Sequence, residues 1–131
     1  MTVAGRTAAT VVLGMGLALT TLPGHAQNWT QVSEGIQYDA RSLRVNGNLR
    51  QVWMQIDFSA PDRTAASINR FRGLFEFDCT VSRFRMLSME SHSGKGVLVD
   101  KGSDIRTEWT SITRAHEAEA AVRARVCAVR N

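Results

Sequence analysis

Apolar and polar residues alternate along the middle of the chain, and this pattern predicts β-strands. The clearest strand is expected at residues 49–59, where the period of two is typical of a strand with one buried face. Its expected inward face carries Val52, Met54, Ile56 and Phe58. Shorter strands are expected at 28–33, 36–38, 43–45 and 97–99, with loops at 91–96 and 100–103. Asn46-Gly47 favours a tight hairpin turn, because both residues tolerate the positive φ of a type I′ turn.

The stretch from residue 70 to residue 88 contains the triplet Arg-Phe-Arg twice, at 70–72 and at 83–85. A hairpin that turns near residues 79–81 pairs odd positions of the first half with even positions of the second. The expected apolar face then carries Phe71, Phe75, Phe77, Cys79, Phe84 and Met86. The arginines lie on the opposite face with Glu76 and Asp78, which is the arrangement of a half-buried antiparallel sheet.

The C-terminal region changes to the period of a helix. Thr113 is the expected cap, and the helix is expected within residues 115–129. Its apolar stripe consists of Ala118, Val122, Val126 and Val129. Cys127 lies off this stripe on a flank of small residues. Either the helix packs on its alanine side, or it ends before Cys127.

Residues 1–26 have the features of a signal peptide. Arg6 precedes an apolar run at residues 8–19, and Gly24-His25-Ala26 places small residues at the expected distances from a cleavage site before Gln27. An uncleaved membrane anchor is the alternative. The apolar run is short for a span of about 20 residues and contains glycines, which favours cleavage.

The remaining residues, 27–131, are expected to form one small domain in the periplasm or outside the cell. Cysteine is absent near the expected cleavage site, so a lipoprotein anchor is not indicated. No later apolar run is long enough to cross a membrane, so no transmembrane segment is expected after cleavage.

An exported chain with two cysteines predicts one disulfide, between Cys79 and Cys127. Two free thiols or an intermolecular bond are the alternatives. Because the helix carries one cysteine and the aromatic sheet face carries the other, the bond would hold the helix across that face. The expected fold class is α+β, an antiparallel sheet with a C-terminal helix packed on one face and tied by a disulfide.

The chain carries 16 Lys and Arg against 12 Asp and Glu, a formal net charge of +4. This small excess and the exported location argue against a nucleic-acid partner. The candidate face for an anionic partner carries Arg70, Arg72, Arg83 and Arg85. Such a surface suits a protein, an acidic polysaccharide, a lipid headgroup or a haem propionate. The alternative is a solvated face on which Glu76 and Asp78 balance the arginines.

Catalytic and metal-binding patterns are sparse after residue 26. His92 lies in a Ser-Gly loop, His116 lies beside two glutamates, and the sequence offers no reason to bring the two histidines together. Gly94-Lys95-Gly96 is too short for a phosphate loop. We therefore expect no catalytic residue, no metal site, no cofactor and no enzymatic activity.

A set of residues, taken in order, resembles the surface-adhesin protein E family of exported bacterial domains. The set comprises Trp29, Tyr38-Asp39, Ser42-Leu43, Val52-Trp53, Glu76-Phe77-Asp78-Cys79, Arg83-Phe84-Arg85-Met86-Leu87-Ser88, Trp109 and Val126-Cys127. The resemblance implies an antiparallel sheet of about six strands, with a C-terminal helix tied to its concave face by a disulfide. The member that names the family is a lipid-anchored surface adhesin for host matrix proteins.

Two functional hypotheses follow. The first is a non-enzymatic, exported interaction module that resembles surface adhesin E and binds host matrix or envelope partners. The alternative is a periplasmic protein that binds a small acidic or haem-like ligand in the trough between the sheet and the helix.

Overall fold

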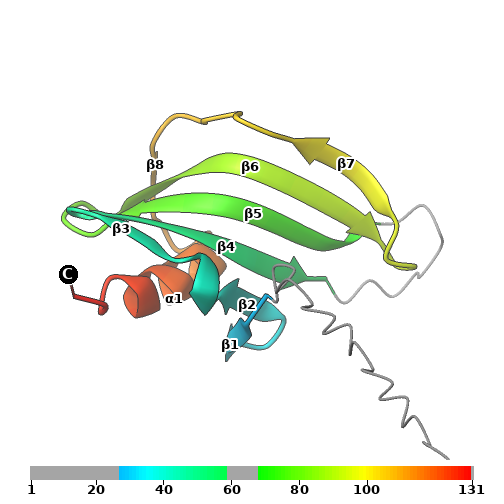
Figure 1. The fold of residues 1–131 in the computed structure, drawn as a ribbon, viewed down its shortest axis with the longest axis horizontal. Coiled ribbons are helices and arrows are strands. Elements are labelled where there is room, and N and C mark those ends of the chain that lie inside the picture. The colour runs from blue at the N-terminus through cyan, green and yellow to red at the C-terminus, as the bar shows by residue number, and fades with distance from the viewer. Residues whose placement is uncertain (1–26, 59–67, 131) are drawn as a thin grey trace, which may run out of the picture.

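Antiparallel strands make up most of the molecule, and the C-terminal helix lies against one face of them (Figure 1). The computed structural model describes residues 27–58 and 68–130. These residues form an eight-stranded sheet in the order β1-β2-β4-β5-β6-β7, with β3 paired to β4 and β8 paired to β6. The predicted α+β class and the antiparallel sheet are confirmed, whereas the expected signal peptide at 1–26 lies outside the described residues.

The N-terminal strands are β1 (Trp29–Ser33), β2 (Ile36–Asp39), β3 (Arg44–Asn46) and β4 (Leu49–Asp57). A 3-10 turn, η1 (Ala40–Ser42), separates β2 from β3. The remaining elements are β5 (Ile68–Asp78), β6 (Arg83–Ser93), β7 (Leu98–Gly102), β8 (Thr110–Ser111) and the helix α1 (Glu117–Val126).

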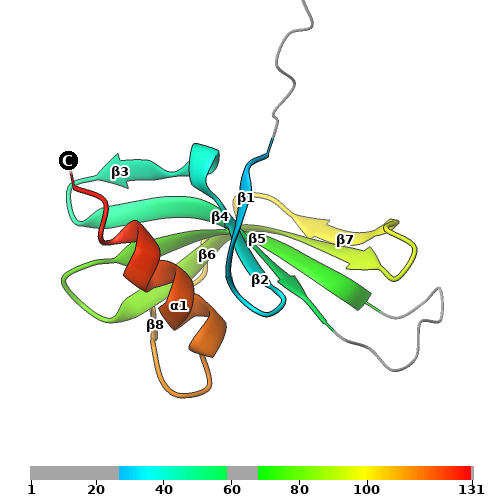
Figure 2. The same cartoon turned by 90° about the horizontal axis from the view of Figure 1, so that it is seen from below.

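The sheet is strongly twisted. In Figure 2, β4 lies above β6 at the end of the sheet near α1 and below it at the other end. This is the cumulative result of the right-handed twist of each strand. The helix therefore covers only one end of the sheet's apolar face (Figure 2).

The alternation in β4 sets the core face as expected. Val52 and Met54 are fully buried, and Val52 pairs with Phe75 on β5. Phe58 was expected on the same face, but β4 ends at Asp57 and Phe58 is 48% exposed. β4 therefore ends two residues before its expected boundary, and Phe58 does not join the buried core.

The two Arg-Phe-Arg triplets lie on the β5–β6 hairpin, as predicted. Phe77 pairs with Phe84 and Phe75 pairs with Met86, so the phenylalanines share the core face. The ring centroids of Phe75 and Phe84 are 5.8 Å apart, and those of Phe75 and Phe77 are 6.1 Å apart. Aromatic pairs at this spacing add to the stabilisation from burial alone.

The helix begins later and ends earlier than the sequence pattern predicts. Thr113 forms a turn before the helix, in which its hydroxyl accepts a hydrogen bond from the Ala115 N–H. Val122 and Val126 are fully buried against the sheet, which confirms the central part of the predicted stripe. Val129 lies beyond the helix and is 43% exposed, so its assignment to the stripe is wrong.

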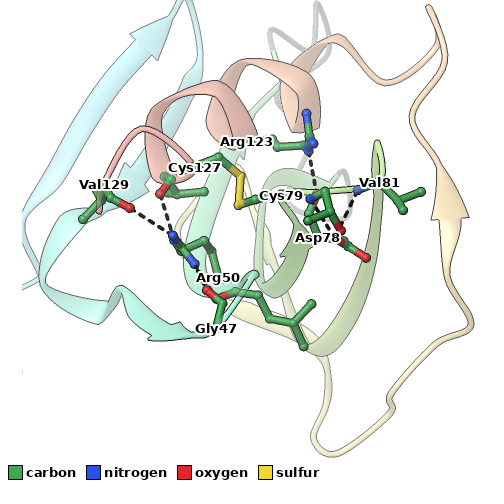
Figure 3. The surroundings of a disulfide bond; sticks show 11 residues. Gly47, Arg50, Asp78, Cys79, Val81, Arg123, Cys127 and Val129 are labelled. Atoms are coloured by element: carbon green, nitrogen blue, oxygen red, sulfur yellow. Dashed lines mark hydrogen bonds between the residues drawn. A yellow bond between two sulfur atoms is a disulfide. The ribbon is translucent and has the colours of Figure 1, made fainter. Parts of the chain in front are cut away.

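The disulfide joins Cys79 and Cys127, with an S–S distance of 2.07 Å and a Cα–Cα distance of 5.6 Å (Figure 3). Cys127 is the C-cap residue of α1, so of the two alternatives the helix ends before this cysteine. A second link lies beside the disulfide, where Arg123 Nε donates to the carbonyl oxygen of Asp78 at 2.9 Å. The helix is therefore fastened to the β5–β6 turn by a covalent bond and a hydrogen bond.

The region after β6 differs from its sequence-based assignment. Residues 97–99 were expected as a strand and 100–103 as a loop, but β7 runs from Leu98 to Gly102. Lys101 pairs with Glu90, and Gly102 pairs with Met89. Pairing with β6 extends the strand beyond its apolar residues. In the described part of the chain, no helix has the length and apolar character needed to cross a membrane.

Candidate binding face

The face of the sheet opposite α1 carries the polar positions of β4, β5 and β6. Its side chains alternate with the buried core positions, as Gln51 and Trp53 do with Val52 and Met54. All four predicted arginines occupy polar positions on this face, namely Arg70, Arg72, Arg83 and Arg85. We call this surface the polar face.

Three of these arginines form ion pairs. Arg70 Nε lies 2.6 Å from Asp57 Oδ1, and Arg83 Nε lies 3.0 Å from Asp78 Oδ2. The third pair joins Arg85 to the carboxylate of Glu76, with an Nη2–Oε1 distance of 2.6 Å. Glu76 and Asp78 are each only 5% exposed, so their ion pairs are better shielded from water than those of an open surface.

Asp78 also organises the β5–β6 turn. Its Oδ1 accepts hydrogen bonds from the N–H and hydroxyl of Thr80 and from the N–H of Val81. Burial by itself would raise the pKa of Asp78, but these hydrogen bonds and the one from Arg83 lower it to about 2. The carboxylate therefore stays ionised at neutral pH and fixes the turn that precedes Arg83.

Arg72 differs from the other three arginines. Its Nε donates to Gln55 Oε1 at 2.7 Å, and its guanidinium lies 5.3 Å from the centre of the Trp29 ring. Within residues 27–58 and 68–130, no ion pair joins Arg72 to a carboxylate. Its charge is therefore held in place by an amide and an aromatic ring and is not neutralised by a described acid.

Trp109 stacks against both arginines of the second triplet, Arg83 and Arg85. Its ring centre lies 4.5 Å from the guanidinium carbon of Arg83 and 4.4 Å from that of Arg85. The three tryptophans of the chain, Trp29, Trp53 and Trp109, thus all lie on the polar face and are all half-buried. In the sequence, Trp29 and Trp109 contribute only to the family resemblance, because their arginine partners are distant along the chain.

A depression of about 330 Å³ lies on the same face. Its lining consists of Gln51, Leu74, Leu87, Ser88, Asp104 and Arg106. The segment that carries Asp104 and Arg106 follows β7 and is attached to β6, because the N–H of Ile105 donates to the carbonyl oxygen of Leu87 at 3.0 Å. The sequence contained no signal for this site, because Asp104 and Arg106 lie in a segment without apolar periodicity.

The two histidines stay apart, as expected. His116 packs its ring on Phe84 with 5.2 Å between centroids, whereas His92 lies eight positions further along β6. At about 3.3 Å per residue along a strand, His92 lies roughly 25 Å from Phe84, the residue that His116 contacts. Among the described residues, no group of three or more His, Cys, Asp or Glu side chains is arranged to hold a metal ion.

Side chains fill the contact between the sheet and the helix. Val122 and Val126 of α1 are fully buried, as are Val52, Met54 and Phe77 of the sheet. These residues belong to one core cluster. The hypothesis of a small-ligand site in a sheet–helix trough therefore gains no support from the packing of these residues.

The fold of this chain is similar to that of a protein whose structure is solved. A solved structure, protein E from non-typeable Haemophilus influenzae, is similar with a TM-score of 0.52 and 12% sequence identity, over 76% of this chain and 75% of that chain. None of the curated proteins matches the chain. A sequence model of the family described as surface-adhesin protein E matches residues 29–128. The chain therefore belongs to the surface-adhesin protein E family.

Proposed function

We propose that this protein is an exported, non-enzymatic interaction module whose polar face binds an anionic partner in the extracellular matrix or the cell envelope. The observation that carries the proposal is the position of the three tryptophans. All of them lie half-buried on the face away from α1, and arginines stack on two of them, Trp29 and Trp109. Tryptophan and arginine are the residues that most often dominate binding at protein interfaces.

Arg72 is the residue best prepared to contact the partner. The Trp29 ring and Gln55 orient its guanidinium, and the described residues supply no carboxylate to neutralise it. A pre-oriented guanidinium loses little side-chain entropy when it binds a planar anion. The other three arginines are already paired, so they support the face and contribute less net charge to it.

Export is supported by two features of the chain. Residues 1–26 have the pattern of a signal peptide, and the disulfide is typical of proteins that leave the reducing cytoplasm. Membership of a surface-adhesin family agrees with such a location. N-terminal sequencing of the protein from a fractionated Gram-negative host tests this directly. A protein that begins at Gln27 in the periplasm or medium is expected, and an unprocessed cytoplasmic protein would contradict the proposal.

Binding is tested with a pair of variants that change the net charge equally. Arg72→Gln removes the candidate contact, whereas Arg125→Gln removes an exposed charge on α1, which packs on the other face. The oxidised protein is applied to immobilised heparin and to surfaces coated with matrix proteins, and elution is followed against salt. We expect Arg72→Gln to elute at lower salt than Arg125→Gln. Equal elution of the two variants would show that only net charge matters and would reject the polar face.

The two kinds of surface distinguish the two classes of partner. Retention on matrix protein that persists in excess soluble heparin indicates a protein partner. Retention that soluble heparin abolishes on both surfaces indicates an anionic polysaccharide.

A further inference from the structure

Three irregularities of the backbone meet at the depression on the polar face. Leu87 is the extra residue of a bulge in β6, because Ser88 pairs with Leu74 while Met86 pairs with Phe75. Within the described ranges, Asp104 and Arg106 are the non-glycine residues with positive φ, at 52° and 30°. Bulges and left-handed residues re-aim side chains, and they concentrate at binding sites. Leu87, Asp104 and Arg106 all line this one depression.

The left-handed conformation is unusual for arginine. Asparagine, aspartate and glycine adopt it readily, but a long side chain in this region strains the backbone. Arg106 is held there from both sides, because the N–H groups of Ile105 and Thr107 donate to carbonyl oxygens of β6 at 3.0 and 2.9 Å. The fold thus maintains a strained conformation that places Arg106 at the depression.

Of the four polar side chains that line the depression, only Gln51 has a hydrogen-bond or ion-pair partner among the described residues. Asp104 and Arg106 carry opposite charges, yet no ion pair joins them to each other or to another described residue. The Ser88 hydroxyl also makes no hydrogen bond among the described residues. The side-chain amide nitrogen of Gln51 donates to Glu76 Oε2 at 2.7 Å. This hydrogen bond orients the side chain and leaves its carbonyl oxygen available as an acceptor.

We propose that this depression is a subsite for one sugar residue that bears a carboxylate, such as a uronic acid within an acidic polysaccharide. Arg106 supplies a planar donor for the sugar carboxylate. Asp104, Ser88 and the Gln51 carbonyl accept hydrogen bonds from ring hydroxyls, while Leu74 and Leu87 contact the apolar C–H surface of the ring. The volume of about 330 Å³ lies at the small end of the roughly 300–1,000 Å³ of ligand sites.

The presence of Asp104 separates this ligand class from simple anions. A bare carboxylate or phosphate would be repelled by Asp104, whereas a sugar acid offers hydroxyl donors to it. The inference rests on the proposed function only in that both use the polar face. Arg72 does not line the depression, so the two are tested by different residues.

The experiment is a ¹⁵N-resolved NMR titration of the oxidised protein with four probes. Glucuronate carries both a carboxylate and hydroxyls, glucose carries hydroxyls only, acetate carries a carboxylate only, and glycine is a zwitterion. We expect saturable shifts with glucuronate at the amides of residues 51, 74, 87–88 and 104–107. Glucose and acetate are expected to bind at least about tenfold more weakly, since each satisfies only part of the site.

Charge-matched variants assign the contacts. Arg106→Gln is expected to weaken glucuronate about tenfold and leave glucose unchanged, whereas Lys101→Gln, on β7, changes neither. Asp104→Asn is expected to weaken both sugars, with Asp100→Asn as its control. Arg106→Gly removes the guanidinium but suits the left-handed φ, so it folds and still loses the preference for glucuronate over glucose.

Four outcomes overturn the subsite. These are acetate binding as tightly as glucuronate, glycine binding most tightly, glucuronate shifts that do not saturate, and equal effects of the Arg106 and Lys101 variants. A failed titration alongside Arg72-dependent heparin retention removes the subsite and leaves the proposed function. If glucuronate binding depends on Arg106 but heparin retention does not depend on Arg72, the subsite stands and the proposed function is rejected.

Discussion

Arg50 donates its Nε hydrogen to the carbonyl oxygen of Val126 at 3.3 Å, which joins the central strand β4 to the last residue of α1 (Figure 3). The side chain lies on the core face and is 6% exposed. Its Nη2 donates to the carbonyl oxygen of Val129 at 3.0 Å. Its Nη1 donates to the carbonyl oxygens of Gly47 and Leu49 at 2.6 and 3.1 Å. A buried cation thus caps the C-terminal, negative end of the helix dipole.

Replacing this cation should destabilise the protein. Arg50→Met keeps the apolar part of the side chain but removes the donors to four carbonyls. The expected loss in the free energy of unfolding is about 2–3 kcal/mol, because the buried hydrogen bond to Val126 and the three part-buried hydrogen bonds to Gly47, Leu49 and Val129 are lost. Urea unfolding of the oxidised protein measures it. Arg44→Met, at an exposed position on β3, is the control and should cost less than about 0.5 kcal/mol.

The disulfide should account for a large share of the stability. It closes a loop with a sequence separation of 48, for which the chain-entropy model gives about 4 kcal/mol. We expect Cys79→Ala/Cys127→Ala to lower the free energy of unfolding by about 3–4 kcal/mol. Because Arg50 and the disulfide hold the same end of α1, the cost of Arg50→Met should shrink in the double alanine background. Additive costs would show that the two links act independently.

Gly73 should not tolerate a methyl group. It lies on the core face between two aromatic residues, and a Cβ there would lie 3.2 Å from Phe71 Cε1 and closer still to the Phe75 ring. Phe75 is 4% exposed and cannot move aside without disturbing the core. Gly73→Ala should therefore cost about 1–3 kcal/mol in thermal or urea unfolding.

Gly102→Ala is the matched control for Gly73. Its nearest neighbour is Cγ2 of Ile105, a residue that is 37% exposed and can shift toward solvent more easily than the buried Phe75. The control should cost much less than Gly73→Ala. A similar loss for both glycines would mean that strand propensity, and not the clash with Phe75, sets the cost.

The stability of the protein should fall in acid through Asp78. Its pKa is lowered from 3.8 to about 2 in the folded state, so its contribution is complete above pH 4 and is lost as the pH falls through 2. The contribution is about 1–2 kcal/mol. The Asp78→Asn variant lacks this contribution. The difference in the free energy of unfolding between the wild-type protein and the variant should therefore narrow as the pH falls from 5 to 2. A constant difference across this range in urea unfolding would contradict the assignment.

Local patterns were sufficient for the faces of β4 and of the β5–β6 hairpin. Alternation in β4 and in the β5–β6 hairpin reports burial directly, because successive side chains of a strand point to opposite faces. Two cysteines allow only one intramolecular disulfide, and the structure contains it between Cys79 and Cys127. Arg50 shares its parity with Val52 and Met54, so the same pattern placed a charge on the core face, although sequence reasoning did not use it.

The errors at element ends have a common cause. Phe58 and Val129 continue an apolar pattern beyond the point where a neighbouring element covers them. Residues 100–102 lack an apolar pattern but form a strand because β6 offers unpaired backbone groups beside them. In each case a partner element distant in sequence decides where the element stops.

The sequence by itself determined the fold class, the disulfide and the face on which the arginines lie, because these follow from local periodicity and from the number of cysteines. Only the tertiary structure decided which arginine pairs with no carboxylate among residues 27–58 and 68–130, that Trp29 and Trp109 stack on arginines, and that a bulge and two left-handed residues surround a depression. These features depend on strand register and on the path of the chain after β7. Register brings together residues that are tens of positions apart, and no local pattern encodes which of them meet.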